Sequence, residues 1–142
     1  DGDITLESFK EAYNADLANG IGNLTSRVMK MAVDNVSGPV SIPERTLPED
    51  FLNAFDRYDV QGATALVSKA MSTLDARIQE TAPFKLVKTD KEKGVAIIEE
   101  LVRSLYTIAR MLNPILPETS EKIKTLIKEN RMPSEPLFPR KP

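Results

Sequence analysis

The stretch GVAIIEELVRSLYTIARML, residues 94–112, shows most clearly how this chain folds. Its apolar residues recur at spacings of three and four, which is the period of one face of an α-helix. They are Val95, Ile98, Leu101, Val102, Leu105, Ile108, Ala109 and Leu112. An apolar face this broad is typical of a helix that packs into a core. We therefore expect a buried helix over residues 94–112.

Helical spacing also appears on both sides of this segment. It predicts a helix from residue 6 to about 33, a short helix after Pro48, and further helices over 60–80 and from 117 onward. Pro83 should end the third of these, because the residue before a proline avoids helical geometry. Alternating runs typical of strands are almost absent. The sequence therefore predicts an all-α bundle of about five helices.

The length of 142 residues favours a single domain over 1–142 with one hydrophobic core. The segment DNVSGPVSIPERTLP, residues 34–48, is rich in Pro, Gly, Ser and Asn, so we expect a long connecting loop there. Residues 129–142 contain several prolines, which predicts an extended tail.

The composition argues against catalysis by this chain alone. It has no histidine and no cysteine, which removes the commonest general base, thiolate nucleophiles and zinc sites built from these residues. We therefore expect no catalytic residues, no metal site and no cofactor in this domain. The acidic N-terminus lacks the layout of a signal peptide, and no apolar run is long enough to span a membrane. These features favour a cytoplasmic protein without a membrane partner.

The net charge of −2 and the pI of about 5.3 argue against broad, charge-driven binding of nucleic acid. A contact with nucleic acid should therefore be local. A few amide, guanidinium and aromatic groups that meet unpaired bases would be sufficient for it.

The stretch YNADLANGIGNLTSR, residues 13–27, contains such groups. Asn19, Asn23 and Arg27 are four residues apart, so they lie on one face of the predicted helix. Asparagine is a poor helix former, which favours a role for these amides outside the helix. An alternative of about equal weight is that they only hydrogen-bond a neighbouring helix. Gly20 and Gly22 lie in the same helix, where a close approach by another element or a gentle bend would explain them.

Four segments occur in an order that resembles bacterial methionyl-tRNA synthetases. They are YNADLANGIGNLTSR at 13–27, ETAPFKL at 80–86, LNPILPETSEKI at 112–123 and PLFPR at 136–140. The resemblance covers nearly the whole chain and falls in the C-terminal helical anticodon-binding domain of those enzymes. It therefore implies the helical bundle of class I aminoacyl-tRNA synthetases that binds the anticodon.

The resemblance implies recognition of the CAU anticodon of methionine tRNAs, which supports ATP-dependent aminoacylation in protein biosynthesis. The positions that match the family's anticodon-binding residues are Asn19, Asn23, Arg27, Pro83 and Phe84. The implied partners are the anticodon loop and the catalytic domain of the same enzyme, with no DNA partner. ATP and methionine would bind that catalytic domain, whose HIGH motif cannot occur in a chain without histidine.

Two positions depart from the family pattern. Phe84 stands where the family usually has tryptophan, so the stacking surface is smaller and the indole N–H is lost. An acidic residue is common in the family near Gln79, which puts in doubt any contact that uses a carboxylate there. Without the resemblance, an aromatic residue after proline would more often be a core plug than a stacking surface.

Two other functions are compatible with the pattern. One is the equivalent domain of a synthetase for isoleucine, valine, leucine or cysteine. The other is a purely structural helical module for docking or dimerisation, and burial of the polar row against other helices would favour it.

Overall fold

A computed structural model describes residues 6–42, 51, 53, 60–113 and 116–133. Within these ranges, side chains are described from residue 20 onward, except those of residues 60, 61 and 64. The predicted short helix after Pro48, residues 43–48 of the predicted 34–48 loop and residues 134–142 of the predicted tail lie largely or wholly outside the described residues. Those predictions stay untested.

The described part of the chain is all-α, as predicted. Four long helices form the bundle: α1 (Leu6–Asn35), α3 (Val60–Thr81), α5 (Lys91–Leu112) and α6 (Pro117–Glu129). A seven-residue helix, α4 (Pro83–Thr89), lies between α3 and α5. The described bundle thus has four long helices, whereas about five were predicted, and α4 is an addition that the sequence pattern did not predict. None of the described helices combines the length and hydropathy of a membrane span.

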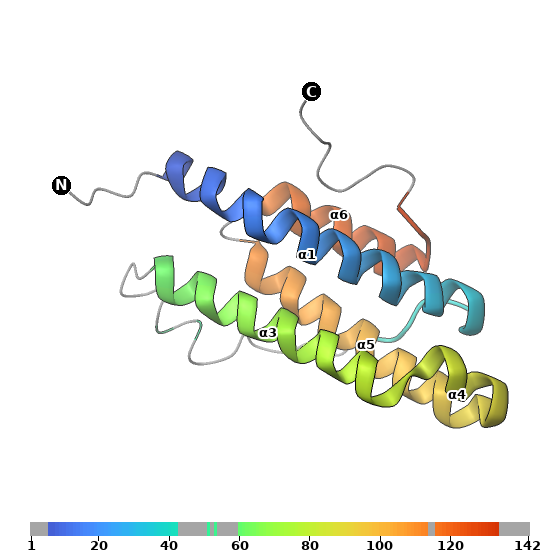
Figure 1. Ribbon diagram of the computed structural model, residues 1–142. Coiled ribbons are helices and arrows are strands. Elements are labelled where there is room, and N and C mark those ends of the chain that lie inside the picture. The colour runs from blue at the N-terminus through green and yellow to red at the C-terminus, as the bar shows by residue number, and fades with distance from the viewer. Residues whose placement is uncertain (1–5, 43–50, 52, 54–59, 114–115, 134–142) are drawn as a thin grey trace.

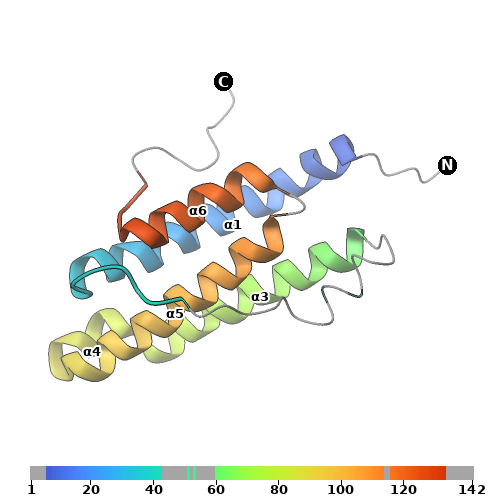
Figure 2. The ribbon, with the colours of Figure 1, turned by 180° about the vertical axis from the view of Figure 1, so that it is seen from behind.

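Helix α5 is the centre of the bundle and contacts α1, α3, α4 and α6. Figures 1 and 2 show α1 and α6 on one side of α5 and α3 on the other. The apolar face predicted from 94–112 supplies much of the core, including Ile98, Leu101, Leu105 and Leu112, all fully buried. Removing the apolar face of α5 from water is favourable, which explains why the other helices assemble around it.

The corner between α3 and α4 confirms the helix end predicted at Pro83 and adds a second role for this proline. Helix α3 does end there, but Pro83 is the first residue of α4, so the proline begins a helix as well. A proline has no N–H and a fixed φ, which suits the first turn of a helix. Ala82 turns the chain with φ 42° and ψ 58°. Its N–H donates to the carbonyl of Ile78 and its own carbonyl accepts from the N–H of Leu86.

The two glycines inside α1 have different environments. A Cβ at Gly20 would lie 2.7 Å from Cε of Met71 on α3, so the predicted close approach is confirmed at this position. A Cβ at Gly22 would meet nothing within 4 Å among the described residues, so these residues give no close approach there. The absence of a Cβ at Gly20 therefore leaves room for the end of the Met71 side chain.

Thr25 gives a stability prediction. Its side chain is fully buried, and Oγ1 has no hydrogen-bond partner among the described residues. A buried hydroxyl without a partner costs free energy, because it has lost its water. Thr25→Val, which replaces the hydroxyl by a methyl group, should raise the free energy of unfolding in urea by about 1 kcal/mol.

A matched control is Ser120→Ala on α6. Ser120 is also buried, but its hydroxyl donates to the carbonyl of Ala109 on α5. This change should lower the free energy of unfolding by about 1 kcal/mol. A loss of stability in both variants would show that Thr25 has a partner in the folded protein.

Candidate nucleic-acid interface

The polar row of α1 is exposed where the structure describes it. Asn23 is exposed, and Arg27, one turn later, keeps 45% of its side chain accessible. Ile21 and Leu24 on the same helix are buried, whereas Asn23 and Arg27 are exposed. The two polar residues therefore lie outside the core. Asn19 lies in α1, but its side chain is outside the described residues. The exposure of Asn23 leaves its amide accessible to a ligand.

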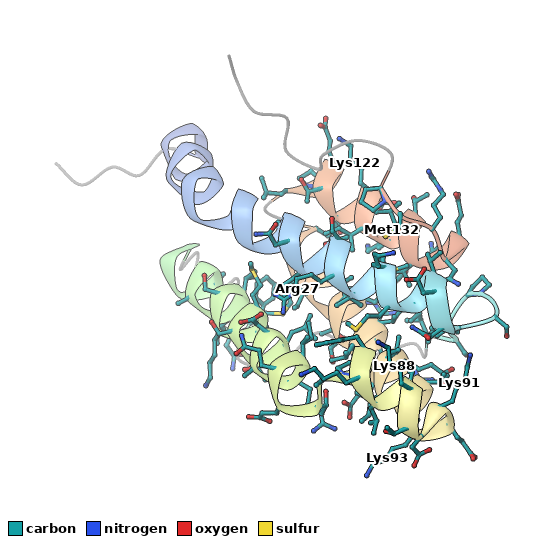
Figure 3. All side chains as sticks on the ribbon, turned by 45° about the vertical axis from the view of Figure 1, so that its right-hand side comes forward. Arg27, Lys88, Lys91, Lys93, Lys122 and Met132 are labelled. Carbon is teal, nitrogen blue, oxygen red and sulfur yellow. The ribbon has the colours of Figure 1, made fainter. Side chains whose placement is uncertain are left out.

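Arg27 is paired across the bundle. Its Nη1 lies 2.7 Å from Oδ1 of Asp75 on α3, and Figure 3 shows Arg27 between these two helices. The other carboxylate oxygen, Oδ2, accepts a hydrogen bond of 2.9 Å from Nε2 of Gln79, one turn further along α3. A guanidinium has several N–H donors, so this pair leaves Arg27 able to bind a second group. Arg27, Asp75 and Gln79 thus form a hydrogen-bonded chain across α1 and α3, which begins at the last residue of the polar row of α1.

The α3–α4 corner lies at the end of this hydrogen-bonded chain. Gln79 is in the last turn of α3, and Pro83 and Phe84 begin α4. Pro83 is buried, whereas Phe84 is 51% exposed. The core-plug interpretation of Phe84 is therefore wrong. The ammonium of Lys85 lies 5.8 Å from the centre of the Phe84 ring, which shows that a positive group can approach this ring from solvent.

The position of α4 is set by its packing on α5. A Cβ at Gly94 would lie 2.8 Å from the backbone nitrogen of Val87 and 2.6 Å from its Cγ1. Only a glycine allows the two backbones to come this close without a shift. Helix α4 also contacts α1. These contacts hold Phe84 in a fixed place relative to the polar row.

Four lysines lie along α4 and the start of α5, the segment that follows the corner. Lys85 and Lys88 lie on α4, and Lys91 and Lys93 follow at the start of α5, where Figure 3 shows the last three at one end of the molecule. All four are exposed. Asp90 and Glu92 are the acidic residues in this segment, so residues 85–93 carry a local excess of positive charge in a chain of net charge −2. A phosphate backbone would meet attraction here and not over the whole surface.

An open groove of about 530 Å³ lies between α3 and α5, on the other flank of α3 from Asp75. Its lining is mostly apolar, with Leu66 and Met111 among its residues. It also contains an ion pair in which Arg77 Nε lies 2.9 Å from Glu100 Oε2. The hydrogen bond and negative charge of Glu100 raise the pKa of Arg77 above its ordinary value. This arginine is thus engaged within the protein.

The structure brings together part of the predicted site. Arg27 is linked through Asp75 to Gln79, which lies in the last turn of α3 before the Pro83–Phe84 corner, and Asn23 is one turn from Arg27. Sequence reasoning missed Asp75 and Lys85. Asp75 and Gln79 are four residues apart on a predicted helix, a spacing that favours a Gln–Asp hydrogen bond. No local pattern indicates the pairing of Asp75 with Arg27, which are 48 residues apart. The binding roles of Asn19, Asn23, Arg27, Pro83 and Phe84 stay predictions.

No family model matches the chain, but comparison with known proteins finds methionine–tRNA ligases among its relatives. The methionine–tRNA ligase of Clostridium acetobutylicum is 31% identical over 140 residues, and that of Streptomyces coelicolor is 30% identical over 143. The corresponding enzyme of Myxococcus xanthus is 27% identical over 133 residues. These alignments cover 85% to 88% of this chain. The chain is homologous to a part of methionine–tRNA ligases.

The homologous part is a minor fraction of each enzyme. The chain spans 19% of the Myxococcus ligase, 26% of the Streptomyces ligase and 22% of the Clostridium ligase. The family resemblance noted from the four sequence segments is thereby confirmed. These relatives support the methionine enzymes over the alternative synthetases for isoleucine, valine, leucine and cysteine.

Proposed function

We propose that this chain recognises the CAU anticodon of methionine tRNAs. The observation that carries the proposal is the half-exposed Phe84 at the corner that follows Gln79, whose amide is linked through Asp75 to Arg27 on α1. This arrangement occurs in a chain homologous to methionine–tRNA ligases. An aromatic surface beside amide and guanidinium groups is what a splayed, unpaired base requires.

The chemistry of each group fits one part of an unpaired nucleotide. The ring of Phe84 offers a stacking surface, and the exposed amide of Asn23 can both donate to and accept from a base edge. Lys85 can leave the ring for a phosphate when a base stacks, because its side chain is exposed and long. The lysines of residues 85–93 supply the local attraction that the net charge of the chain does not.

The proposal places the chain in a larger enzyme. The chain would position methionine tRNA, and a catalytic domain of the same enzyme would bind ATP and methionine and form the aminoacyl ester in the cytoplasm. In this arrangement the domain itself needs no cofactor. Its contribution to catalysis is selection and positioning of the tRNA.

The direct test is an NMR titration of the 142-residue chain with a methionine anticodon stem-loop at low salt. Shifts at Asn23, Arg27 and Phe84 are expected with the CAU loop and not with a loop whose anticodon is replaced. Shifts spread evenly over the lysines with both loops would indicate only charge-driven binding. No shift with either loop at millimolar RNA would favour the structural docking alternative.

Asn23→Ala should weaken binding of the CAU loop about tenfold, because it removes a contact with a base edge worth about 1–3 kcal/mol. The change should leave the melting temperature nearly unchanged, since Asn23 is exposed. Fluorescence titration with a labelled stem-loop measures the affinity. Ser104→Ala, also at an exposed position but on α5, is the control and should bind as the unmodified chain does. Equal affinities for both variants would exclude Asn23 from the interface.

A further inference from the structure

Asp75 receives a donor on each of its two carboxylate oxygens. Arg27 Nη1 lies 2.7 Å from Oδ1, and Gln79 Nε2 lies 2.9 Å from Oδ2. The two donors come from different helices, and all three side chains reach solvent, with 39% of the Asp75 side chain accessible. An exposed ion pair of this kind adds little to stability. The pair also fixes the orientation of the neighbouring side chains.

That effect concerns the orientation of the Gln79 amide. An ionised carboxylate can only accept hydrogen bonds, so Gln79 must turn its NH₂ group toward Asp75. The carbonyl oxygen Oε1 is on the other arm of the same amide and therefore faces away from Asp75. It has no hydrogen-bond donor among the described residues. A glutamine without such a partner would present either its donor or its acceptor to a ligand.

We propose that Asp75 is a positioning residue that makes Gln79 an acceptor for the exocyclic amino group of a bound cytosine or adenine. This inference rests on the proposed function, and it concerns how that site selects its bases. Cytosine carries an amino donor where uracil carries a carbonyl acceptor. Adenine differs from inosine in the same way. An acceptor held in place by Asp75 would pair with the amino-bearing base and oppose the carbonyl-bearing one.

The same carboxylate orients Arg27. With Nη1 engaged by Asp75, the plane of the guanidinium is held between α1 and α3, and its other N–H groups remain for the ligand. Asp75 thus supports one acceptor, on Gln79, and one set of donors, on Arg27. Together they form a polar edge at the end of α3, next to the corner that carries Phe84.

The test measures base discrimination with three stem-loops. They carry CAU, UAU, in which the cytosine is replaced, and CIU, in which inosine replaces the adenine. The unmodified chain should bind CAU more tightly than at least one of the other two, by about tenfold, which is the size of one base-edge contact. Asp75→Asn should reduce that preference to about threefold or less, because Gln79 can then turn and donate to a carbonyl.

Two further variants separate positioning from charge and folding. Glu80→Gln removes one negative charge from an exposed position on the same helix and should keep the preference. The double variant Asp75→Asn, Gln79→Glu should regain it, because a carboxylate at residue 79 accepts in either orientation. A purely structural role for Asp75 would change the melting temperature and would not be rescued in this way.

The outcomes distinguish the two proposals. If Asp75→Asn keeps the preference of the unmodified chain for both bases, the positioning role is overturned while the proposed function stands. If the unmodified chain shows no preference among the loops, and Phe84→Ala and Asn23→Ala do not change binding either, both proposals are overturned. Loss of the preference in Asp75→Asn with its return in the double variant establishes the role of Asp75.

Discussion

Replacing Phe84 by alanine is expected to reduce the affinity for a CAU stem-loop by about 1–3 kcal/mol, which is the value of one base stacked on an aromatic ring. The ring is 51% exposed and begins α4, so it can offer one side to a base while the buried Pro83 anchors the corner. Titration of a fluorescent stem-loop at low salt measures this loss. The free energy of unfolding should change little, because half of the ring is already in water.

The control for Phe84→Ala is Val33→Ala. Val33 is the other large hydrophobic residue found exposed in the described part of the chain, at 40%, and it lies on α1 away from the polar row. Its replacement should leave the affinity for the stem-loop unchanged. Phe84→Trp should strengthen binding, since the larger ring adds stacking surface. If Phe84→Ala destabilised the fold and left RNA binding intact, the ring would be a packing residue.

Gly94→Ala is expected to lower the free energy of unfolding by about 1–3 kcal/mol, as overpacking of a close contact does. The new Cβ would lie 2.8 Å from the backbone nitrogen of Val87 and 3.0 Å from its Cα. These backbone atoms cannot rotate away as a side chain can, so α4 would have to move away from α5. The loss should therefore exceed the gain of up to about 1 kcal/mol that alanine brings to a helix. Urea unfolding measures the difference.

Gly22→Ala is a matched control for Gly94→Ala. It adds the same methyl group to a helix, but at a position where a Cβ meets nothing within 4 Å among the described residues. It should therefore stabilise the protein by up to about 1 kcal/mol. Because α4 carries Phe84, Gly94→Ala should also shift the NMR signals of Phe84 and weaken RNA binding. An increase in stability for both variants would contradict the tight packing of α4 on α5.

The helices that could be predicted are those with a strong local signal. The apolar spacing over 94–112 led to α5, which begins three residues earlier, at Lys91. The prediction from residue 6 to about 33 is confirmed by α1, which ends at Asn35. Helix α4 was missed because its seven residues are too short for a periodic pattern. Pro83 was correctly predicted to end α3, but the same fixed φ that ends one helix also begins the next.

In the candidate site, too, the features with a local sequence signal could be predicted and those that depend on packing could not. Spacing alone put Asn23 and Arg27 on one face of a helix, because that depends only on the 3.6-residue period. Whether Phe84 would be buried could not be decided from its neighbours in the sequence, and the plug alternative was the more common case. The tertiary structure leaves it 51% exposed at the start of α4, a helix that packs on α5 where Gly94 meets Val87.

The sequence by itself thus determined the all-α class, the central helix and the polar face of α1, since each depends on residues close together in the chain. Only the tertiary structure decided that Arg27 on α1 meets Asp75 on α3, and so joins the local Asp75–Gln79 pair. The contact of Arg27 with Asp75 joins residues of different helices, and its geometry depends on how the buried faces of α1, α3 and α5 pack. No local pattern contains that information, because packing is a property of the whole core.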